Sequence, residues 1–175
     1  VTDWFYALNW MRNNESVKVV VSWWDYGYWI TVYGNKTTLS DNGTLNMTQI
    51  EKVAQMFLSN ETEAIKILEQ FDVTKQHDVT HVLIFITFYT ENTENAGQDI
   101  GWGEESKWRW MARISERWTG LNDTGYRTIE YNEETGQYED TGWNDIGKSS
   151  VIYKMMQYVK KAVSSNFGET LDEDS

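Results

Sequence analysis

The feature that most constrains the fold is a run of valines that leads directly into a cluster of aromatic and acidic residues. Val17-Lys18-Val19-Val20-Val21 is β-branched and apolar, which predicts a buried strand. Before it, residues 3–13 place apolar side chains at helical spacing after Asp3, which predicts an N-capped helix. Trp23-Trp24-Asp25-Tyr26-Gly27 follows the strand, at the carboxyl end where α/β folds commonly expose functional side chains.

Trp23, Trp24 and Asp25 have the polar groups that would satisfy one bound hydroxyl. A hydroxyl offers one donor and two acceptor lone pairs, an indole supplies an N–H donor, and a carboxylate supplies acceptors. Such a site rejects a methyl analogue, because the analogue leaves the polar groups of the site unpaired. The competing interpretation is that both rings belong to the core, since most of the 10 tryptophans are expected to be packing groups.

Hydrophobic periodicity predicts a single compact domain of α/β, or mixed α+β, class, with amphipathic helices packed around a small sheet. We expect helices over residues 48–59, 61–71, 104–118 and 151–163, strands over 29–33 and 79–89 with the second central, and a hairpin from 126–131 and 136–143. A chain of 175 residues suits one domain, which we assign to residues 1–168. The acidic residues 169–175 predict a disordered tail.

The charge balance narrows the classes of partner. The chain has 27 Asp and Glu against 15 Lys and Arg, which argues against nucleic acid and anionic membrane surfaces as partners. It has no cysteine, so disulfides and thiolate metal sites are excluded. The longest apolar stretch, residues 82–89, is far shorter than the roughly 20 residues of a membrane-spanning helix. No signal-peptide pattern opens the chain.

The two histidines do not predict a metal site. His77 and His81 are four residues apart, a spacing that would bring them together on a helix. Neighbouring Val79 and Val82 instead favour the start of a strand, and no third ligand is evident.

Residues 23–27 reproduce the signature of the catalytic subunit of N-oligosaccharyltransferase, and the chain resembles the extracytoplasmic C-terminal domain of that family, of the archaeal type. Residues 3–12 resemble the helix that precedes the signature, and residues 28–30 and 37–44 resemble the stretch that follows it. Family members carry a large multispan membrane region before the signature. The resemblance therefore implies a fragment that begins near the membrane boundary.

A second family element places a lysine three residues after an acidic residue, and an apolar residue four further on. Glu104, Lys107 and Met111 resemble this element, with Glu104 in place of the usual aspartate. Their spacing puts all three on one face of a helix. The competing interpretation is an exposed ion pair worth a few tenths of a kcal/mol.

A rival match to this element lies further along the chain. Asp145-Ile146-Gly147-Lys148, with Ile152 four residues later, keeps the aspartate. Gly147 inside a helix would be costly. We therefore expect Asn144 or Asp145 to cap the last helix instead.

The resemblance implies a role for each of these residues. In the family, the tryptophan loop holds the hydroxyl of the Ser or Thr that lies two residues after the acceptor asparagine. Carried over, Trp23 and Trp24 donate N–H bonds to this hydroxyl, and Asp25 accepts a hydrogen bond from it. Met111 packs on the threonine methyl, and one buried methyl, worth about 0.8 kcal/mol, predicts a severalfold preference for Thr over Ser.

Four further residues are expected to support the site rather than contact the peptide. Tyr26 and Gly27 shape the loop, and Glu104 and Lys107 support the pocket from the second element. No residue of the chain is expected to be catalytic.

The resemblance implies a glycosyltransferase at the extracytoplasmic face of the cell membrane. Its partners would be an acceptor peptide with Asn-X-Ser/Thr and a lipid-linked oligosaccharide. The family's Mn²⁺ or Mg²⁺ is held in the membrane-embedded half, so we expect no cofactor in this chain and no activity from it alone. The alternative is a carbohydrate-binding module of an exported protein, since aromatic platforms suit sugar stacking.

The chain itself contains Asn-X-Ser/Thr triplets, which are acceptors for glycans on exported proteins. There are six, beginning at Asn14, Asn35, Asn42, Asn46, Asn60 and Asn122. They fit an extracytoplasmic location.

Overall fold

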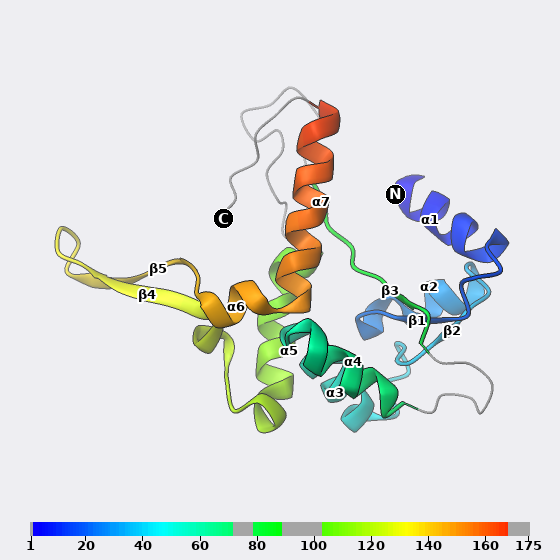
Figure 1. The fold of residues 1–175 in the computed structure, drawn as a ribbon, viewed down its shortest axis with the longest axis horizontal. Helices are drawn as coiled ribbons and strands as arrows, with labels where there is room; N and C mark the ends of the chain where they lie inside the picture. The colour runs from blue at the N-terminus through cyan, green and yellow to red at the C-terminus, as the bar shows by residue number, and fades with distance from the viewer. Residues whose placement is uncertain (1, 72–78, 89–102, 168–175) are drawn as a thin grey trace. The chain divides into compact units, whose positions relative to one another are not determined.

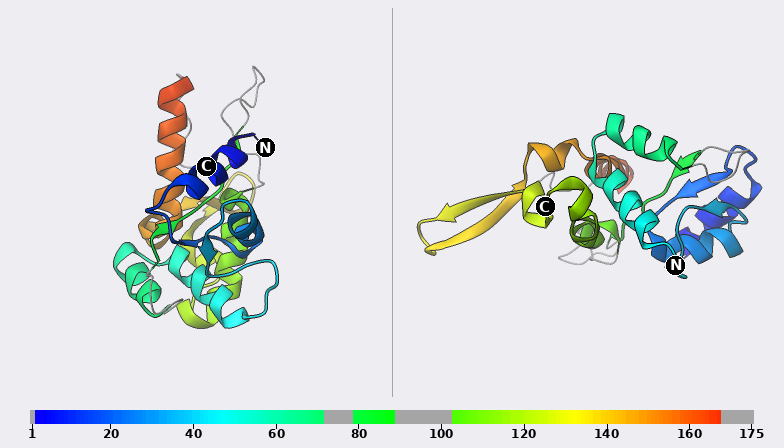
Figure 2. Two further views of the ribbon diagram at one scale, coloured as in Figure 1. Left: turned by 90° about the vertical axis from the view of Figure 1, so that its right-hand side faces the viewer. Right: turned by 90° about the horizontal axis from the view of Figure 1, so that it is seen from below.

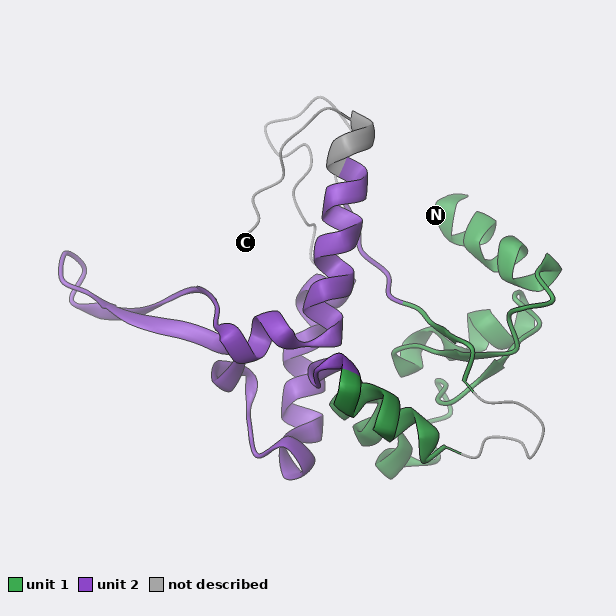
Figure 3. Ribbon diagram, in the orientation of Figure 1, with its two compact units in different colours: residues 1–56, 62–83 green, residues 57–61, 84–175 purple. Residues whose placement is uncertain are grey.

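The computed structural model describes residues 2–71, 79–88 and 103–167 (Figure 1). Contacts divide the chain into two compact units (Figure 3). Unit 1 comprises residues 1–56 and 62–83, and unit 2 comprises residues 57–61 and 84–175. The tryptophan loop therefore lies in unit 1, and Met111 lies in unit 2.

Unit 1 is built on a three-stranded parallel sheet in the order β2-β1-β3. Val19 of β1 lies opposite Thr37 of β2, and Val20 lies opposite His81 of β3. The three valines of β1 are at most 1% exposed, as expected for a parallel strand covered on both faces. The elements that lie wholly or mostly in unit 1 are α1 (Thr2–Asn13), β1 (Val19–Val21), the 3₁₀ turn η1 (Trp24–Tyr26), α2 (Gly27–Val32), β2 (Thr37–Thr38), α3 (Met47–Leu58), α4 (Glu61–Glu69) and β3 (His81–Val82).

The amphipathic helices of this half follow their predicted positions. α1 buries Leu8 and Met11 and ends at Asn13, as the sequence predicts. It begins at Thr2, so Asp3 lies in the first turn, where a carboxylate is favoured by the helix dipole. α3 and α4 also confirm the predicted helices, although α4 ends at Glu69.

The prediction of a strand over residues 29–33 is wrong, because residues 27–32 form α2. η1 runs directly into this helix, and Ile30 is fully buried, whereas Trp29 and Tyr33 are 40% and 49% exposed. The rings of Trp29 and Tyr33 stack with centroids 5.3 Å apart, as side chains four residues apart on a helix do. One buried residue per turn, rather than alternation, marks this segment as helical despite its aromatic and β-branched composition.

The predicted central strand over residues 79–89 is much shorter and lies at an edge. Only His81–Val82 form β3, and β1 is the central strand. Further on, the Phe85 N–H donates to Oε2 of Glu104 at 2.6 Å, and its carbonyl accepts from the Glu104 N–H at 2.9 Å. The main chain at Phe85 is thus bonded to the start of α5 rather than to a neighbouring strand.

Unit 2 combines helices with an antiparallel hairpin, which Figure 2 shows extending away from the unit's helices. Its core contains Trp108 and Trp143, whose rings lie 4.2 Å apart, with Tyr126 6.4 Å from Trp108. Gly120, with φ 70°, ends the first helix of the unit. The elements are α5 (Glu104–Thr119), η2 (Asp123–Tyr126), β4 (Arg127–Asn132), β5 (Gln137–Trp143), α6 (Asp145–Ser149) and α7 (Val151–Phe167).

These elements confirm the mixed α+β class, the helices near 104–118 and 151–163, and the hairpin. Asn144 is a helix cap, as predicted, because its Oδ1 accepts from the Gly147 N–H at 2.9 Å. It caps the short helix α6, which the sequence did not reveal as separate from α7. The assignment of residues 1–168 to one domain stays a prediction, and the tail 169–175 lies outside the described residues.

Candidate functional site

The tryptophan loop leaves the carboxyl end of β1, the central strand of unit 1. Val21 pairs with Val82 at the end of the strand. The turn then begins after Trp23, with the Tyr26 N–H donating to the Trp23 carbonyl at 3.1 Å. The predicted position of the motif at a strand end is confirmed, and such ends are common places for binding sites.

The three residues expected to bind a hydroxyl differ in exposure. Trp23 is 3% exposed, whereas Trp24 and Asp25 are half-buried. The two indole rings are neighbours, with centroids 6.3 Å apart and planes tilted by 54°. Oδ1 of Asp25 is shielded from solvent. The loop therefore leaves Trp24 and Asp25 partly exposed, with Oδ1 of Asp25 covered, and holds Trp23 inside.

The residues that end the motif pack inside unit 1. Tyr26 is 8% exposed, and its ring lies 5.6 Å from that of Trp4. Gly27 passes so close to the following segment that a Cβ would overlap the Ser40 carbonyl and lie 2.5 Å from Cα of Asp41. The φ of Gly27 is an ordinary −57°. Glycine is required here for lack of a side chain, not for its backbone freedom.

Asn42 is a site residue that the sequence analysis named only as the start of an Asn-X-Ser/Thr triplet. Its Nδ2 donates to the Asp25 carbonyl at 3.2 Å, and its Oδ1 accepts from the Tyr28 N–H at 3.3 Å. One side-chain amide thus holds the main chain on both sides of Gly27. The resemblance over residues 37–44 marks the segment, but no local spacing rule predicts a contact between residues 17 positions apart.

The second set of residues lies on one continuous helix, as predicted. Glu104 and Met111 are fully buried on α5, and Lys107 is half-buried. This set belongs to unit 2 and the tryptophan loop to unit 1. A joint contact of Met111 and the tryptophans with one ligand therefore stays a prediction.

The two acidic residues at the start of α5 accept hydrogen bonds from the segment that contains Phe85 and Thr87. Oε2 of Glu104 accepts from Phe85 N–H, while Oε1 of Glu105 accepts from the Thr87 hydroxyl at 3.0 Å and from the Gly103 N–H at 2.8 Å. The helix dipole favours carboxylates in this first turn. Because Glu104 is 0% exposed, it does not lie on the solvated face that an exposed ion pair requires.

The rival set is divided between two helices. Asp145 and Lys148 lie on α6, Ile152 lies on α7, and Ser150 between them has an extended backbone. Gly147 packs against the Tyr126 carbonyl and the Trp143 ring. The rival residues therefore do not share one helical face, whereas those of α5 do.

The histidine prediction falls partly outside the described residues, which do not include His77. His81 begins β3, and its ring lies 6.2 Å from that of Trp10. Across residues 2–71, 79–88 and 103–167, no group of three or more acidic or histidine side chains could hold a metal ion. Within the same ranges, no helix has both the length and the apolar character needed to cross a membrane.

Two arginines of unit 2 contact the carboxylate of Asp140. Arg127 Nε donates to its carboxylate at 2.7 Å, and the Arg109 guanidinium lies 3.2 Å away. Partial burial acts to raise the pKa of Asp140, but hydrogen bonds from Arg127, the Gly142 N–H and Arg109 outweigh it, so the pKa lies below its ordinary value. The cluster joins α5 to the hairpin.

The fold is similar to that of solved oligosaccharyltransferases. One is the C-terminal globular domain of an oligosaccharyltransferase (AfAglB-S2) from Archaeoglobus fulgidus, with a TM-score of 0.50, 24% identity and coverage of 94% of this chain and 86% of that chain. Another is an Archaeoglobus fulgidus oligosaccharyltransferase complexed with Zn and sulfate, with a TM-score of 0.59, 17% identity and coverage of 91% and 24%. At these identities the likeness shows the fold alone.

Comparison of the sequence with family models identifies a family that part of the chain matches. Residues 16–96, which include the tryptophan loop and Asn42, match the family model of the STT3/PglB/AglB core domain. Over this range the chain is similar to that family.

Curated relatives extend the similarity over most of the chain. It is 32% identical over 170 residues to the dolichyl-diphosphooligosaccharide–protein glycosyltransferase subunit stt-3 of Caenorhabditis elegans, covering 96% of this chain and 19% of that protein. It is 33% identical over 159 residues to subunit STT3 of Saccharomyces cerevisiae, covering 89% and 20%. The chain thus spans about a fifth of the length of these relatives.

These relatives are glycosyltransferase subunits, so they do not favour the carbohydrate-binding alternative.

The curated relatives are eukaryotic, while the solved structures are archaeal. An archaeal origin of the chain therefore stays a prediction.

Proposed function

We propose that this chain is the acceptor-recognition domain of an oligosaccharyltransferase, which transfers a lipid-linked oligosaccharide to the asparagine of an Asn-X-Ser/Thr peptide. The observation that carries the proposal is the tryptophan loop, which stands at the end of the central parallel strand and within the range that matches the STT3/PglB/AglB core domain. Two Archaeoglobus fulgidus structures of similar fold hold a tethered acceptor peptide, or an inhibitory peptide with dolichol-phosphate. They support a peptide and a lipid-linked donor as partners.

Recognition begins at the two half-buried residues of the loop. The Asp25 carboxylate accepts a hydrogen bond from the Ser or Thr hydroxyl of the peptide, and the Trp24 indole N–H donates to its oxygen. Trp23, at 3% exposure, supplies the second N–H after its side chain turns outward. A hydrogen bond to an ionised group is worth about 1.5–3 kcal/mol, which is enough to select for a hydroxyl.

The loop is positioned before a peptide arrives. Asn42 bonds to the main chain on both sides of Gly27, and Gly27 itself lies against Ser40 and Asp41. One hydroxyl offers little free energy to offset the entropy of association. A turn fixed by neighbouring groups reduces that entropic cost.

Unit 2 supplies the second contact in this proposal. Met111 packs on the threonine methyl, and Glu104 and Lys107 keep α5 in place. Met111 is fully buried. Its contact with a peptide therefore requires that the side chains covering it move. The expected result is a severalfold preference for Thr over Ser, from about 0.8 kcal/mol per buried methyl.

The contribution of this chain to catalysis is positioning. Mn²⁺ or Mg²⁺ would serve the full-length enzyme, whereas among residues 2–71, 79–88 and 103–167 no group of three or more acidic or histidine side chains could hold the ion. Holding the peptide near the donor converts binding free energy into effective concentration. We therefore propose that the chain alone is inactive and that it works at the extracytoplasmic face of a membrane.

The test is Asp25→Ala in the full-length enzyme, with acceptor peptides that carry Thr, Ser or Val two residues after asparagine. We expect kcat/KM for the Thr peptide to fall about 10- to 100-fold, as the loss of a charge-assisted hydrogen bond predicts. Glu63→Ala, at an acid of α4 that is 52% exposed, is the matched control. Equal transfer by Asp25→Ala and wild type would overturn the assignment.

A second experiment tests the expected inactivity. The isolated chain is mixed with lipid-linked donor, acceptor peptide and Mn²⁺, and glycopeptide is measured by mass spectrometry. No product is expected. Turnover would show that catalytic residues lie within this chain after all.

A further inference from the structure

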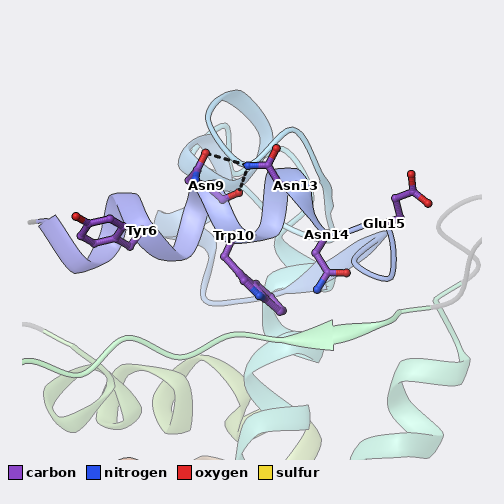
Figure 4. A pocket seen from close by; sticks show the side chains of 6 residues that line it. All are labelled: Tyr6, Asn9, Trp10, Asn13, Asn14 and Glu15. Carbon is purple, nitrogen blue, oxygen red and sulfur yellow. Dashed lines mark hydrogen bonds between the residues drawn. The ribbon is translucent and has the colours of Figure 1, made fainter.

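A pocket of about 650 Å³ lies along α1 and takes no part in the proposed recognition of peptide. Its aromatic residues, Tyr6 and Trp10, are 70% and 55% exposed and lie four residues apart on the helix. Rings beside amide and carboxylate side chains are suited to stacking and hydrogen bonding of a sugar. Figure 4 shows the lining residues, which are Tyr6, Asn9, Trp10, Asn13, Asn14 and Glu15.

One of these lining residues is itself a potential acceptor of a glycan. Asn14 begins the triplet Asn14-Glu15-Ser16, directly after the last residue of α1. Its Oδ1 accepts from the N–H of Ser16 at 3.0 Å and from the Ser16 hydroxyl at 2.7 Å. This Asx turn fixes the amide plane, so Nδ2 is turned away from Ser16. In Figure 4, Nδ2 points to the side of the helix where the Trp10 indole lies.

Three other triplets provide comparisons. The Nδ2 atoms of Asn42 and Asn46 donate to a carbonyl of the tryptophan loop and to the Gln49 side chain, the latter at 3.1 Å. Asn122 adopts the same turn as Asn14, because its Oδ1 accepts from Thr124 N–H at 3.1 Å and from the Thr124 hydroxyl at 2.7 Å. Asn122 is thus the matched comparison for turn geometry.

We propose that Asn14 carries an N-linked glycan whose first sugar ring packs on the indole of Trp10, beside Asn13 and Glu15. The inference rests on the proposed function only for the extracytoplasmic location. In the transfer, Nδ2 of Asn14 bonds to the anomeric carbon of a lipid-linked sugar, the bond from that carbon to the lipid diphosphate breaks with its electron pair, and an amide proton is released. The C–H face of the sugar then removes apolar area of Trp10 from water.

The first experiment measures occupancy in the full-length protein, purified from membranes of a cell that glycosylates its exported proteins. Trypsin cuts after Arg12 and Lys18, which releases Asn14 in a peptide of residues 13–18. Mass spectrometry is expected to find this peptide glycosylated in wild type and in Ser16→Thr, and unmodified in Ser16→Ala. An unmodified wild-type peptide, while other glycoproteins of the same cell are modified, overturns the proposal.

Transfer activity of the same preparation separates this inference from the proposed function. An active enzyme with unmodified Asn14 contradicts the inference alone. Modified Asn14 in a protein that transfers no oligosaccharide contradicts the proposed function alone.

The second experiment tests the stacking on Trp10. Hydroxyl-radical oxidation of Trp10 is expected to be severalfold lower in the glycosylated wild type than in Ser16→Ala. Trp29, 40% exposed on α2, serves as an internal control that should be oxidised equally in both. Thr124→Ala, which removes the Asn122 triplet, should leave Trp10 oxidation unchanged. Equal oxidation of Trp10 with and without the glycan would overturn the stacking.

Discussion

The tryptophan loop of unit 1 and α5 of unit 2 carry the two halves of the predicted recognition site, and they are held in place by different means. The loop is a 3₁₀ turn of 3 residues that depends on Asn42 and on the close passage of Gly27. α5 is a helix of 16 residues, closed by Gly120 and anchored at its start by Glu104. Substitutions in the loop should therefore change its geometry, whereas those in α5 should first change core packing.

The largest effect is expected from the helix. Met111→Ala should lower the free energy of unfolding by about 2–5 kcal/mol, because it deletes a fully buried side chain. Met111→Leu, which conserves volume, should cost less than about 1.5 kcal/mol. Urea denaturation of the chain, followed by circular dichroism, measures both. A cost below about 1 kcal/mol for Met111→Ala would show that this side chain contributes little to core packing. It would then contradict the expectation that substitutions in α5 act first on the core.

A smaller effect is expected at the loop's closest contact. Gly27→Ala should cost about 1–3 kcal/mol, because its Cβ would overlap the main chain of Ser40 and Asp41. The matched control is Gly120→Ala at the end of α5, where nothing lies within 4 Å and only the φ of 70° opposes a side chain. That control should cost about 1 kcal/mol. If Gly27→Ala is the milder of the two, the close packing is not what requires glycine.

The hydrogen bonds from Asn42 should matter less for stability than for peptide binding. Asn42→Asp keeps the acceptor for Tyr28 and removes the donor to Asp25. We expect a loss of about 0.5–1.5 kcal/mol in unfolding free energy, together with a raised KM for the acceptor peptide in the full-length enzyme. Thr44→Val removes the same triplet and leaves the Asn42 amide in place, so it should change neither value. A KM unchanged by Asn42→Asp would show that the loop does not need this positioning.

The smallest effect is the pH dependence of the Asp140 cluster. Because its folded pKa is lowered, the carboxylate stabilises the fold above the unfolded pKa of about 3.9 and loses this contribution as pH falls through the folded pKa. The difference in unfolding free energy between wild type and Asp140→Asn should therefore shrink between pH 7 and a pH of about 2.5. A constant difference would show that the carboxylate's charge is not what stabilises the hairpin against α5.

Much of the fold could be predicted because its elements have local causes. The valines of β1, the apolar stripe of α3 and the turn at Gly136 each act within a few residues. α2 could not be predicted in this way, since its composition resembles a strand and its helical character shows only in the burial of Ile30. The shortening of the predicted strand at 79–89 follows from Glu104, 19 residues from Phe85.

In the candidate site, too, only the features with a local cause could be predicted from the sequence. The position of Trp23 and Trp24 after a buried strand follows from the sequence, and the spacing of Glu104, Lys107 and Met111 correctly predicts one helix. The unequal exposure of Trp23 and Trp24 depends on packing around the whole turn. The hydrogen bond from Asn42 to the Asp25 carbonyl joins residues that are 17 positions apart in the sequence. Neither has a local pattern.

The absence of any linker between η1 and α2 has a mechanical consequence. The turn ends at Tyr26 and the helix starts at Gly27, so a displacement of the turn is expected to move the first residues of α2 as well. A displacement of α2 would carry the stacked rings of Trp29 and Tyr33 with it. The surroundings of the Trp29 ring are therefore expected to change when a peptide binds to the tryptophan loop.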